Sequence, residues 1–436
     1  MPLSALLKAR FGPFRHPRFR IFYSAQSLSL IGNWMQEIAR SWIILSLTGK
    51  ASAMGILLAA QAVPGLLFGT FGGSIADQRD VRSILIVTQV ALATLAFSLG
   101  IVVSQGNVEL WHLIVFAAME GTIIAFDMPA FYKITPSLVP REDFQQALAL
   151  NSVSFHLSRV LGPTIAGIVM GIWGTASVFW INAVSFLGIV LVVARMPIFE
   201  SKAQVGPVAT QKGMREALKY IRGHPKLGNI LLQLALIIAF VFPLIFTTFR
   251  VYLQKKFALD AKGFGLVFSF PGMGALLGSL TFLLTSPKNP LKVLPFGIIG
   301  VCLTLAVIPL FDTLIPTIAA VTIFSFCMFL SISSLTVTTQ LTIDNQYRGR
   351  ISALVGMGFV SLAPIMSGPM GLLSDIVGER ALIWSVAIVL FVASAALFIR
   401  DKNLGSGLRR PRPNKRKAGP SEDDDGEGHP LRRLEP

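Results

Sequence analysis

Six ionisable side chains interrupt long apolar stretches of this 436-residue sequence, and they define the chemistry available to it. They are Glu37, Arg40, Glu120, Asp127, His156 and Arg159. A charged group at the centre of a bilayer costs about 2.5 to 3.5 kcal/mol on insertion scales, so such groups mark ion paths, proton carriers or buried ion pairs. Carboxylates that could carry protons, and bases that could pair with them, are therefore the first candidates for function.

Glu120 and Asp127 lie seven residues apart in AMEGTIIAFDMPAFYK. On an α-helix this spacing puts both side chains on nearly one face, about 10.5 Å apart along the axis. Arg159, in the next apolar run, is expected at the depth of Glu120, which predicts a Glu120–Arg159 ion pair. A guanidinium favours the ionised carboxylate and desolvation favours the protonated one, so Glu120 is either a proton carrier or half of a structural pair.

Asp127 belongs to the stretch FDMPA, nearer the inner end of its run. Pro129 leaves a backbone carbonyl without its helical partner and can bend the helix there. We expect Asp127 to pair with Arg79 or Arg82 when an inner gate is shut, and to be hydrated or protonated when it is open.

The other two pairs of candidates allow a functional and a structural interpretation each. Glu37 and Arg40 are three residues apart and can neutralise each other on one helix face at the outer rim of a cavity, or they can recognise cargo. His156, one turn before Arg159, is either a proton shuttle or a hydrogen-bonded packing residue.

Composition indicates a membrane protein, because 53% of the residues are hydrophobic and only 14% are charged, against about 25% charged in soluble domains. A helix of about 20 apolar residues spans a bilayer. We predict an all-α fold with spans near 21–47, 53–76, 83–103, 110–133, 144–170, 175–194, 228–249, 263–285, 291–310, 315–340, 350–374 and 381–399.

The distribution of positive charge predicts the orientation. With a cytoplasmic N-terminus, 30 of the 38 Lys and Arg residues fall in inner segments and 6 in outer loops, as the positive-inside rule requires. Both termini are therefore expected in the cytoplasm, and the net charge of +16 does not indicate a nucleic-acid partner. The basic outer loop 250–262 departs from the rule.

The chain is expected to divide into two six-helix halves, because Gly162-Pro163 and Gly368-Pro369 occur at matching places in the fifth span of each half. Parallel repeats of this kind are typical of transporters with a midplane site between the halves. The predicted parts are a basic N-terminus 1–20, a bundle 21–194, a cytoplasmic linker 195–227, a bundle 228–400 and a disordered tail 401–436.

The linker contains GMREALKYIRGHP, in which Met214, Leu218 and Ile221 share one helical face. This pattern favours a basic amphipathic helix on the inner membrane surface over a solvated linker. The tail alternates basic and acidic blocks without apolar periodicity, so it is expected to be solvated or to touch anionic lipid.

A short charged loop, GGSIADQRDVRS, joins the second and third spans. Its charges can pair with one another and with helix ends, or be solvated in a tight turn. The stretch resembles the loop signature of the major facilitator superfamily, which implies a gating role for Gly73, Asp77, Arg79 and Arg82. Gln78 and Asp80 depart from that signature.

Two further resemblances narrow the family. SRVLGPTIAG resembles the antiporter signature of the superfamily, with Gly162, Pro163 and Gly167 in place and Ala166 where glycine is common. FRHPRFRIFYSAQSLSLIGNWMQEIARSWIILSLTG, FDMPA, LVPREDFQQALALNS and DNQYRGRISAL look like the branch that holds macrolide and enterobactin exporters. That branch is similar to drug:proton antiporters, which implies export driven by proton uptake.

Motifs for other chemistries are missing from the sequence. It has no G-x-x-x-x-G-K-[ST], H-E-x-x-H or C-x-x-C, and Cys302 and Cys327 fall in apolar runs, so we expect no cofactor and no metal. GMGALLG at 272–278 is expected to serve close helix packing. Transport energy must then come from an ion gradient.

We therefore predict a twelve-helix major facilitator fold and a proton-coupled exporter of amphipathic small molecules, not an enzyme. An importer or a lipid or lysolipid mover is the alternative within transport, and a channel or a membrane sensor is the alternative outside it. The expected partners are small-molecule cargo, protons and membrane lipid. The expected location is a bacterial cytoplasmic membrane, as a monomer.

Overall fold

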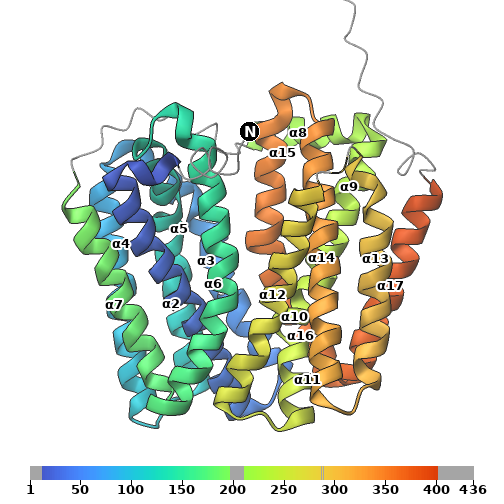
Figure 1. Cartoon of the computed structure of the whole chain (residues 1–436), viewed down its shortest axis with the longest axis horizontal. Coiled ribbons are helices and arrows are strands. Elements are labelled where there is room, and N and C mark those ends of the chain that lie inside the picture. Colours follow the sequence, from blue (N-terminus) through green and yellow to red (C-terminus); the bar gives the residue numbers. More distant parts are fainter. Residues whose placement is uncertain (1–11, 197–210, 286, 288, 401–436) are drawn as a thin grey trace, which may run out of the picture.

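A computed structural model describes residues 12–196, 211–285, 287 and 289–400 of the chain. The predicted tail, the first eleven residues and part of the linker lie outside the described residues. Two groups of helices stand side by side in Figure 1, and α8 (Gln211–Gly223), which belongs to the predicted linker 195–227, lies at one end of them. We call this end the linker face and the opposite end the far face.

The first half consists of helices that alternate in direction between the two faces. They are α2 (Pro17–Thr48), α3 (Ala51–Gln78), α4 (Val81–Ser104), α5 (Leu110–Ser137), α6 (Phe144–Trp173) and α7 (Thr175–Ala194). Gly49 ends α2 in the left-handed conformation (φ 60°), which allows the tight turn into α3 at the far face.

The second half contains interrupted helices. They are α9 (Pro225–Leu236), α10 (Phe242–Phe246), α11 (Thr248–Phe257), α12 (Ala261–Thr285), α13 (Leu294–Val307), α14 (Leu314–Thr342), α15 (Asn345–Met357), α16 (Ala363–Val377) and α17 (Glu379–Arg400). π-Helical turns at Ile237–Val241 and Gly358–Leu362 join α9 to α10 and α15 to α16. The seventh span therefore runs on to Phe257, beyond its predicted end at 249.

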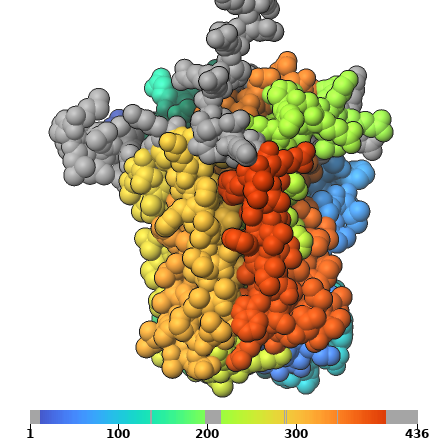
Figure 2. Space-filling view, turned by 90° about the vertical axis from the view of Figure 1, so that its right-hand side faces the viewer, coloured from blue at the N-terminus to red at the C-terminus, as the bar shows by residue number. Residues whose placement is uncertain are grey.

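Within the described residues, eleven helical runs are long and apolar enough to cross a membrane. The remaining long helix, α2, has 32 residues and is less apolar because it carries buried polar groups such as Gln36 and Arg40. Together these helices match the predicted runs and confirm the predicted fold. Figure 2 shows α13 and α17 on the outer surface of the second half, where Phe296, Leu303 and Ile388 are exposed, as lipid-facing residues are.

α8 packs on α15 rather than standing alone at the linker face. Ala217 is fully buried there, and the Tyr220 ring stacks on Tyr347 with centroids 4.2 Å apart. Leu218, predicted on the apolar face, is 45% exposed. The face of α8 that packs on the second half is instead the one that carries Ala217 and Tyr220. Docking on the second half therefore sets the orientation of this helix, and its contact with a membrane surface stays a prediction.

Glycines bring the two halves together in the part of the molecule nearer the far face. A Cβ atom on Gly265 of α12 would lie 2.4 Å from the Cα atom of Gly167 in α6. A Cβ atom on Gly55 of α3 would lie 2.1 Å from the carbonyl oxygen of Ser367 in α16. These two helix contacts form a close-packed seam between the halves, and only residues without a side chain fit there.

Candidate functional site

A cavity of about 600 Å³ lies on the linker side of this seam. All of its walls come from the first half, from α2, α4, α5, α6 and α7. Its lining residues are Gln26, Ser29, Leu30, Asn33, Gln89, Leu92, Glu120, Ile124, Asp127, Met128, Phe131, Tyr132, Phe144, Leu148, Asn151, Ser152, Phe155, His156, Phe186 and Ile189. Two predicted carboxylates and the predicted histidine thus meet in one space, and Tyr132, which is 65% exposed, extends it toward the linker face.

Glu120 forms a buried ion pair with Arg40 of α2. The predicted Glu120–Arg159 pair is wrong, and so is the predicted local pair of Glu37 with Arg40. The prediction compared only the depths of Glu120 and Arg159 along the membrane. The rotation of each helix about its axis decides which side chains face each other, and α2 is rotated so that Arg40 faces α5. The charge of Glu120 is neutralised in this arrangement.

Among the described residues, Asp127 has only neutral hydrogen-bond partners. Its Oδ1 atom accepts hydrogen bonds from the Thr88 hydroxyl at 2.5 Å and from the Gln89 amide at 3.0 Å, both on α4. The side chain is 7% exposed and lines the cavity, where it contacts neither Arg79 nor Arg82. The predicted gate contact is absent in this conformation, because α4 of the same half already holds the carboxylate.

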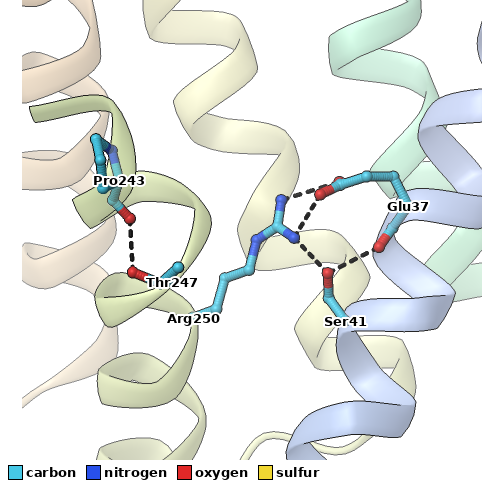
Figure 3. A network of polar contacts seen from close by, with 5 residues as sticks. All are labelled: Glu37, Ser41, Pro243, Thr247 and Arg250. Atoms are coloured by element: carbon cyan, nitrogen blue, oxygen red, sulfur yellow. Dashed lines mark hydrogen bonds and ion pairs between the residues drawn. The ribbon is translucent and has the colours of Figure 1, made fainter. Parts of the chain in front are cut away.

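Glu37 pairs with a residue of the other half, Arg250 of α11, as Figure 3 shows. The guanidinium donates to both carboxylate oxygens, at 2.6 and 2.9 Å, and also to the Ser41 hydroxyl. A helix break at Thr247 (φ −122°, ψ −80°) precedes α11 and turns Arg250 inward. Arg250, predicted in an outer loop, is therefore a buried residue that joins the halves.

Arg159 is buried among aromatic rings. Its guanidinium carbon lies 4.7 Å from the Phe329 ring centre, 5.6 Å from Trp34 and 5.9 Å from Phe246, distances typical of cation–π contacts. Within the described part of the chain it has no carboxylate within 4 Å. With Glu37 it borders a separate space of about 20 Å³ in the seam, not the large cavity.

His156 lines the cavity, and its ring stands edge-on to Phe329 at 6.1 Å. Its Nδ1 atom is buried without a hydrogen-bond partner among the described residues. The predicted hydrogen bond of a packing residue is therefore not present at Nδ1, and a role of His156 in proton movement stays a prediction.

Two other basic residues of segment 250–262 pair with carboxylates of the second half. Lys255 pairs with Glu379 at 2.8 Å, and Lys256 pairs with Asp312 at 3.2 Å. Lys262 lies in the seam, where its Cβ would be 3.2 Å from a Cβ on Gly171. Local carboxylates and helix packing thus explain why this stretch departs from the positive-inside pattern.

Two carboxylates in the loop between α3 and α4 have specific partners. Asp77 pairs with Lys133 of α5, whose ammonium also donates to the Ala76 carbonyl at 2.8 Å. Asp80 caps the N-terminus of α4 by accepting from the backbone N–H of Ser83 at 3.1 Å. Lys133 was not predicted, although a lysine at the end of an apolar run is itself a signal for a buried ion pair.

The other residues of this loop differ in their contacts. Arg82 donates to the carbonyl of Ala194 at the end of α7, so it ties α4 to α7. Arg79 is exposed, and Gly73 is half-buried. Next to it, a Cβ atom on Gly72 would lie 2.1 Å from the carbonyl oxygen of Ala125, so the glycine is needed for α3 to pack on α5.

The glycines of the antiporter-like stretch in α6 serve close packing on both sides. A Cβ atom on Gly162 would lie 2.3 Å from the Cβ of Trp34 in α2, while Gly167 meets α12 in the seam. Pro163 is buried within the helix between them. In α12, Gly274 and Gly278 pack against backbone carbonyls of α14, which confirms the packing interpretation of GMGALLG.

Asp375 adds a contact between the halves that sequence reasoning missed. Its carboxylate at the end of α16 accepts from the backbone N–H groups of Ala51 and Ser52, at 2.8 and 3.0 Å. It thereby caps the N-terminus of α3, where the helix dipole favours negative charge. The sequence could not predict this role of Asp375, because its partner is the N-terminus of a helix more than 300 residues away.

No group of three or more His, Cys, Asp or Glu residues in the described part of the chain could hold a metal ion. Cys302 and Cys327 are both buried and free. The chemistry available in the cavity is therefore that of carboxylates, amides, hydroxyls and one imidazole.

Sequence comparison relates the chain to bacterial transporters. It is 24% identical over 263 residues to the staphyloferrin A transporter of Staphylococcus aureus, covering 60% of this chain and 66% of that protein. It is 22% identical to macrolide efflux protein A of Streptococcus pyogenes, over 49% of this chain and 54% of that one. The chain thus spans two thirds or less of these relatives, but 98% of the multidrug efflux pump Tap of Mycolicibacterium fortuitum, with 23% identity.

Solved structures and a family match agree on the fold. A bacterial homologue of the lysosomal transporter Spinster, in an inward-facing, unoccupied conformation, superposes with a TM-score of 0.70 at 12% identity, covering 92% of this chain and 99% of that one. A bacterial homologue of ferroportin, also inward-facing, gives 0.68 at 15% identity, over 90% and 99% of the chains. Residues 8–416 match the family described as transmembrane secretion effector. The chain therefore belongs to this family of the major facilitator superfamily.

Proposed function

We propose that the chain is a secondary active transporter that exports amphipathic small molecules across the cytoplasmic membrane in exchange for protons. The observation that carries the proposal is the cavity of about 600 Å³ on the linker side of the seam, which contains Asp127, a carboxylate with no cationic partner among the described residues. Alternating access requires a binding space on one side of a closed contact between two halves that can rock, and this cavity lies in the first half on the linker side of the seam.

The positive-inside pattern supports a cytoplasmic linker face. The cavity then takes cargo from the cytoplasm, and the seam closes the outer side. The Glu37–Arg250 pair and the Asp375 cap both cross this seam, so they hold the outer side shut. Relatives that are named as efflux proteins support export, and the inward-facing state of two structural neighbours supports this assignment of the conformation.

Asp127 is the proposed proton carrier. Glu120 already has Arg40 as its counter-ion, whereas the described residues offer Asp127 only neutral donors. A carboxylate that lines the cavity without a fixed cation can exchange a proton with the solvent there. Asp77, Lys133 and Arg82 are proposed to fix the cytoplasmic ends of α3, α5, α4 and α7 as the halves move.

Proton release by purified protein tests this proposal. Protein in weakly buffered detergent with a pH dye is challenged with a macrolide, a catecholate siderophore and a lipophilic cation. We expect cargo-triggered release from wild type, its loss in Asp127→Asn, and its persistence in Asp312→Asn, a carboxylate at the far face. Release that persists in Asp127→Asn would refute the assignment of the carrier.

Direction is tested separately in everted membrane vesicles. Export predicts accumulation of the labelled cargo inside vesicles whose interior is acidified, and collapse of the accumulation when the pH gradient is dissipated. Accumulation only with the opposite gradient would identify an importer.

A further inference from the structure

The charges around the cavity point to the class of cargo, and this inference rests on the proposed function. Of the lining residues, two are carboxylates, one is a histidine, and none is a lysine or an arginine. The rest are amides, hydroxyls and apolar or aromatic side chains. An anionic molecule would meet no fixed positive charge in these walls.

Three buried cations are found among the described residues of the first half, and none of them lines the cavity. Arg40 is paired with Glu120, and Lys133 is turned toward Asp77 and the Ala76 carbonyl. Arg159 lies in the seam and borders the separate space of about 20 Å³. These three buried positive charges are therefore either neutralised or kept out of the cavity.

Only one of the two carboxylate oxygens of Asp127 accepts hydrogen bonds from the described residues. Thr88 and Gln89 both donate to Oδ1, and the described residues offer no donor to Oδ2. Oδ2 is not among the buried polar atoms that are sealed off without a partner. It is therefore the oxygen that a ligand in the cavity can reach, and the two donors on α4 fix the orientation of the group.

Aromatic side chains complete the site. Tyr132 lies on the same helix as Asp127, and Phe155 lines the cavity from α6, where it is 45% exposed. Aromatic rings attract cations through their faces and also bury apolar surface. A cavity that holds both a carboxylate and such rings matches a molecule that has both a positive charge and an apolar body.

We infer that the cargo is a cationic amphiphile whose protonated amine binds Oδ2 of Asp127. The ammonium and the transported proton then compete for the same oxygen, so each binding event displaces the other. A hydrogen bond between two charged groups favours the amine over an acid of the same size by about tenfold or more.

A set of matched fluorescent probes tests this inference. Dansylcadaverine carries an amine, 6-(dansylamino)hexanoic acid carries a carboxylate on a chain of similar length, and N-acetyl-dansylcadaverine is neutral. Their affinities for the purified full-length protein are measured at pH 8 by dansyl fluorescence, for wild type, Asp127→Asn and Asp312→Asn. The neutral probe reports whether each variant keeps a folded cavity.

Wild type and Asp312→Asn are expected to bind the amine at least about tenfold more tightly than the acid. Asp127→Asn should lose this preference while it binds the neutral probe as wild type does. The inference is overturned if the acid binds as tightly as the amine, or if the preference survives in Asp127→Asn.

The two proposals fail in different ways. Proton release triggered by the catecholate siderophore but not by the lipophilic cation would overturn the cationic cargo and leave the exporter standing. Absence of saturable binding for all three probes would remove the cavity as the cargo site, and the proposed function with it.

Discussion

The ion pair between Glu37 and Arg250 gives the sharpest test of how the halves are held together. Arg250→Gln removes the guanidinium that bridges α2 and α11 at 2.6 and 2.9 Å from Glu37. The arginine side chain is 4% exposed and the glutamate side chain 19%, so the remaining carboxylate would be largely desolvated in the closed seam. Opening of the far side would hydrate it.

The magnitude follows from the cost of an unpaired buried charge. Breaking such a pair costs about 3 to 5 kcal/mol when the charge stays fully buried. Because Glu37 keeps some exposure and Arg159 borders the same small space, we expect about 2 to 3 kcal/mol. That shifts the balance between closed and open far sides by roughly 30-fold to 150-fold toward the open form.

Pulsed electron spin resonance between labels on the far face measures this shift. Gln105→Cys and Thr313→Cys place one label on each half, in a background in which Cys302 and Cys327 are replaced by alanine. Wild type in liposomes should give one short distance, and Arg250→Gln should give mainly a longer one. Lys255→Gln, which breaks an exposed pair with Glu379 inside the second half, should leave the distance unchanged.

A double variant separates the unpaired charge from the loss of contacts. Glu37→Gln combined with Arg250→Gln leaves no charge to bury, so its far side should open less than that of Arg250→Gln alone. A double variant that opens as far as the single one would refute the electrostatic reasoning.

Two further predictions concern the same seam. Asp375→Asn keeps the shape of the side chain but removes the charge that caps α3, and we expect a shift of about 1 kcal/mol toward the open far side in the same label pair; no shift would mean that the cap does not hold the seam. Gly265→Leu places a side chain against the backbone of α6, where Cβ alone is 2.4 Å from Gly167, so the short distance should disappear and transport should stop. Gly188→Leu is its control, since a Cβ there meets no atom within 4 Å, and equal effects of both would contradict the packing argument.

The sequence by itself determined the spans, because the free energy of burying about 20 apolar residues in a bilayer depends on composition and not on tertiary contacts. It also located the chemistry: Glu120, Asp127 and His156 do meet in one cavity, as an ionisable group within an apolar run leads one to expect. The packing role of GMGALLG was also predictable, because small residues at helical spacing in an apolar run let two helices approach closely.

Only the tertiary structure decided which charges meet. Arg40 pairs with Glu120, and Arg250 with Glu37, because pairing depends on the rotation of each helix and on how the halves dock. Neither the rotation of a helix nor the docking of the halves can be derived from the spacing of residues along one helix. Arg159 has aromatic neighbours from both halves, and Asp375 caps a helix of the other half, so their environments exist only once the halves are joined. Helix periodicity fixes the face on which a side chain lies, but packing across helices fixes what that face meets.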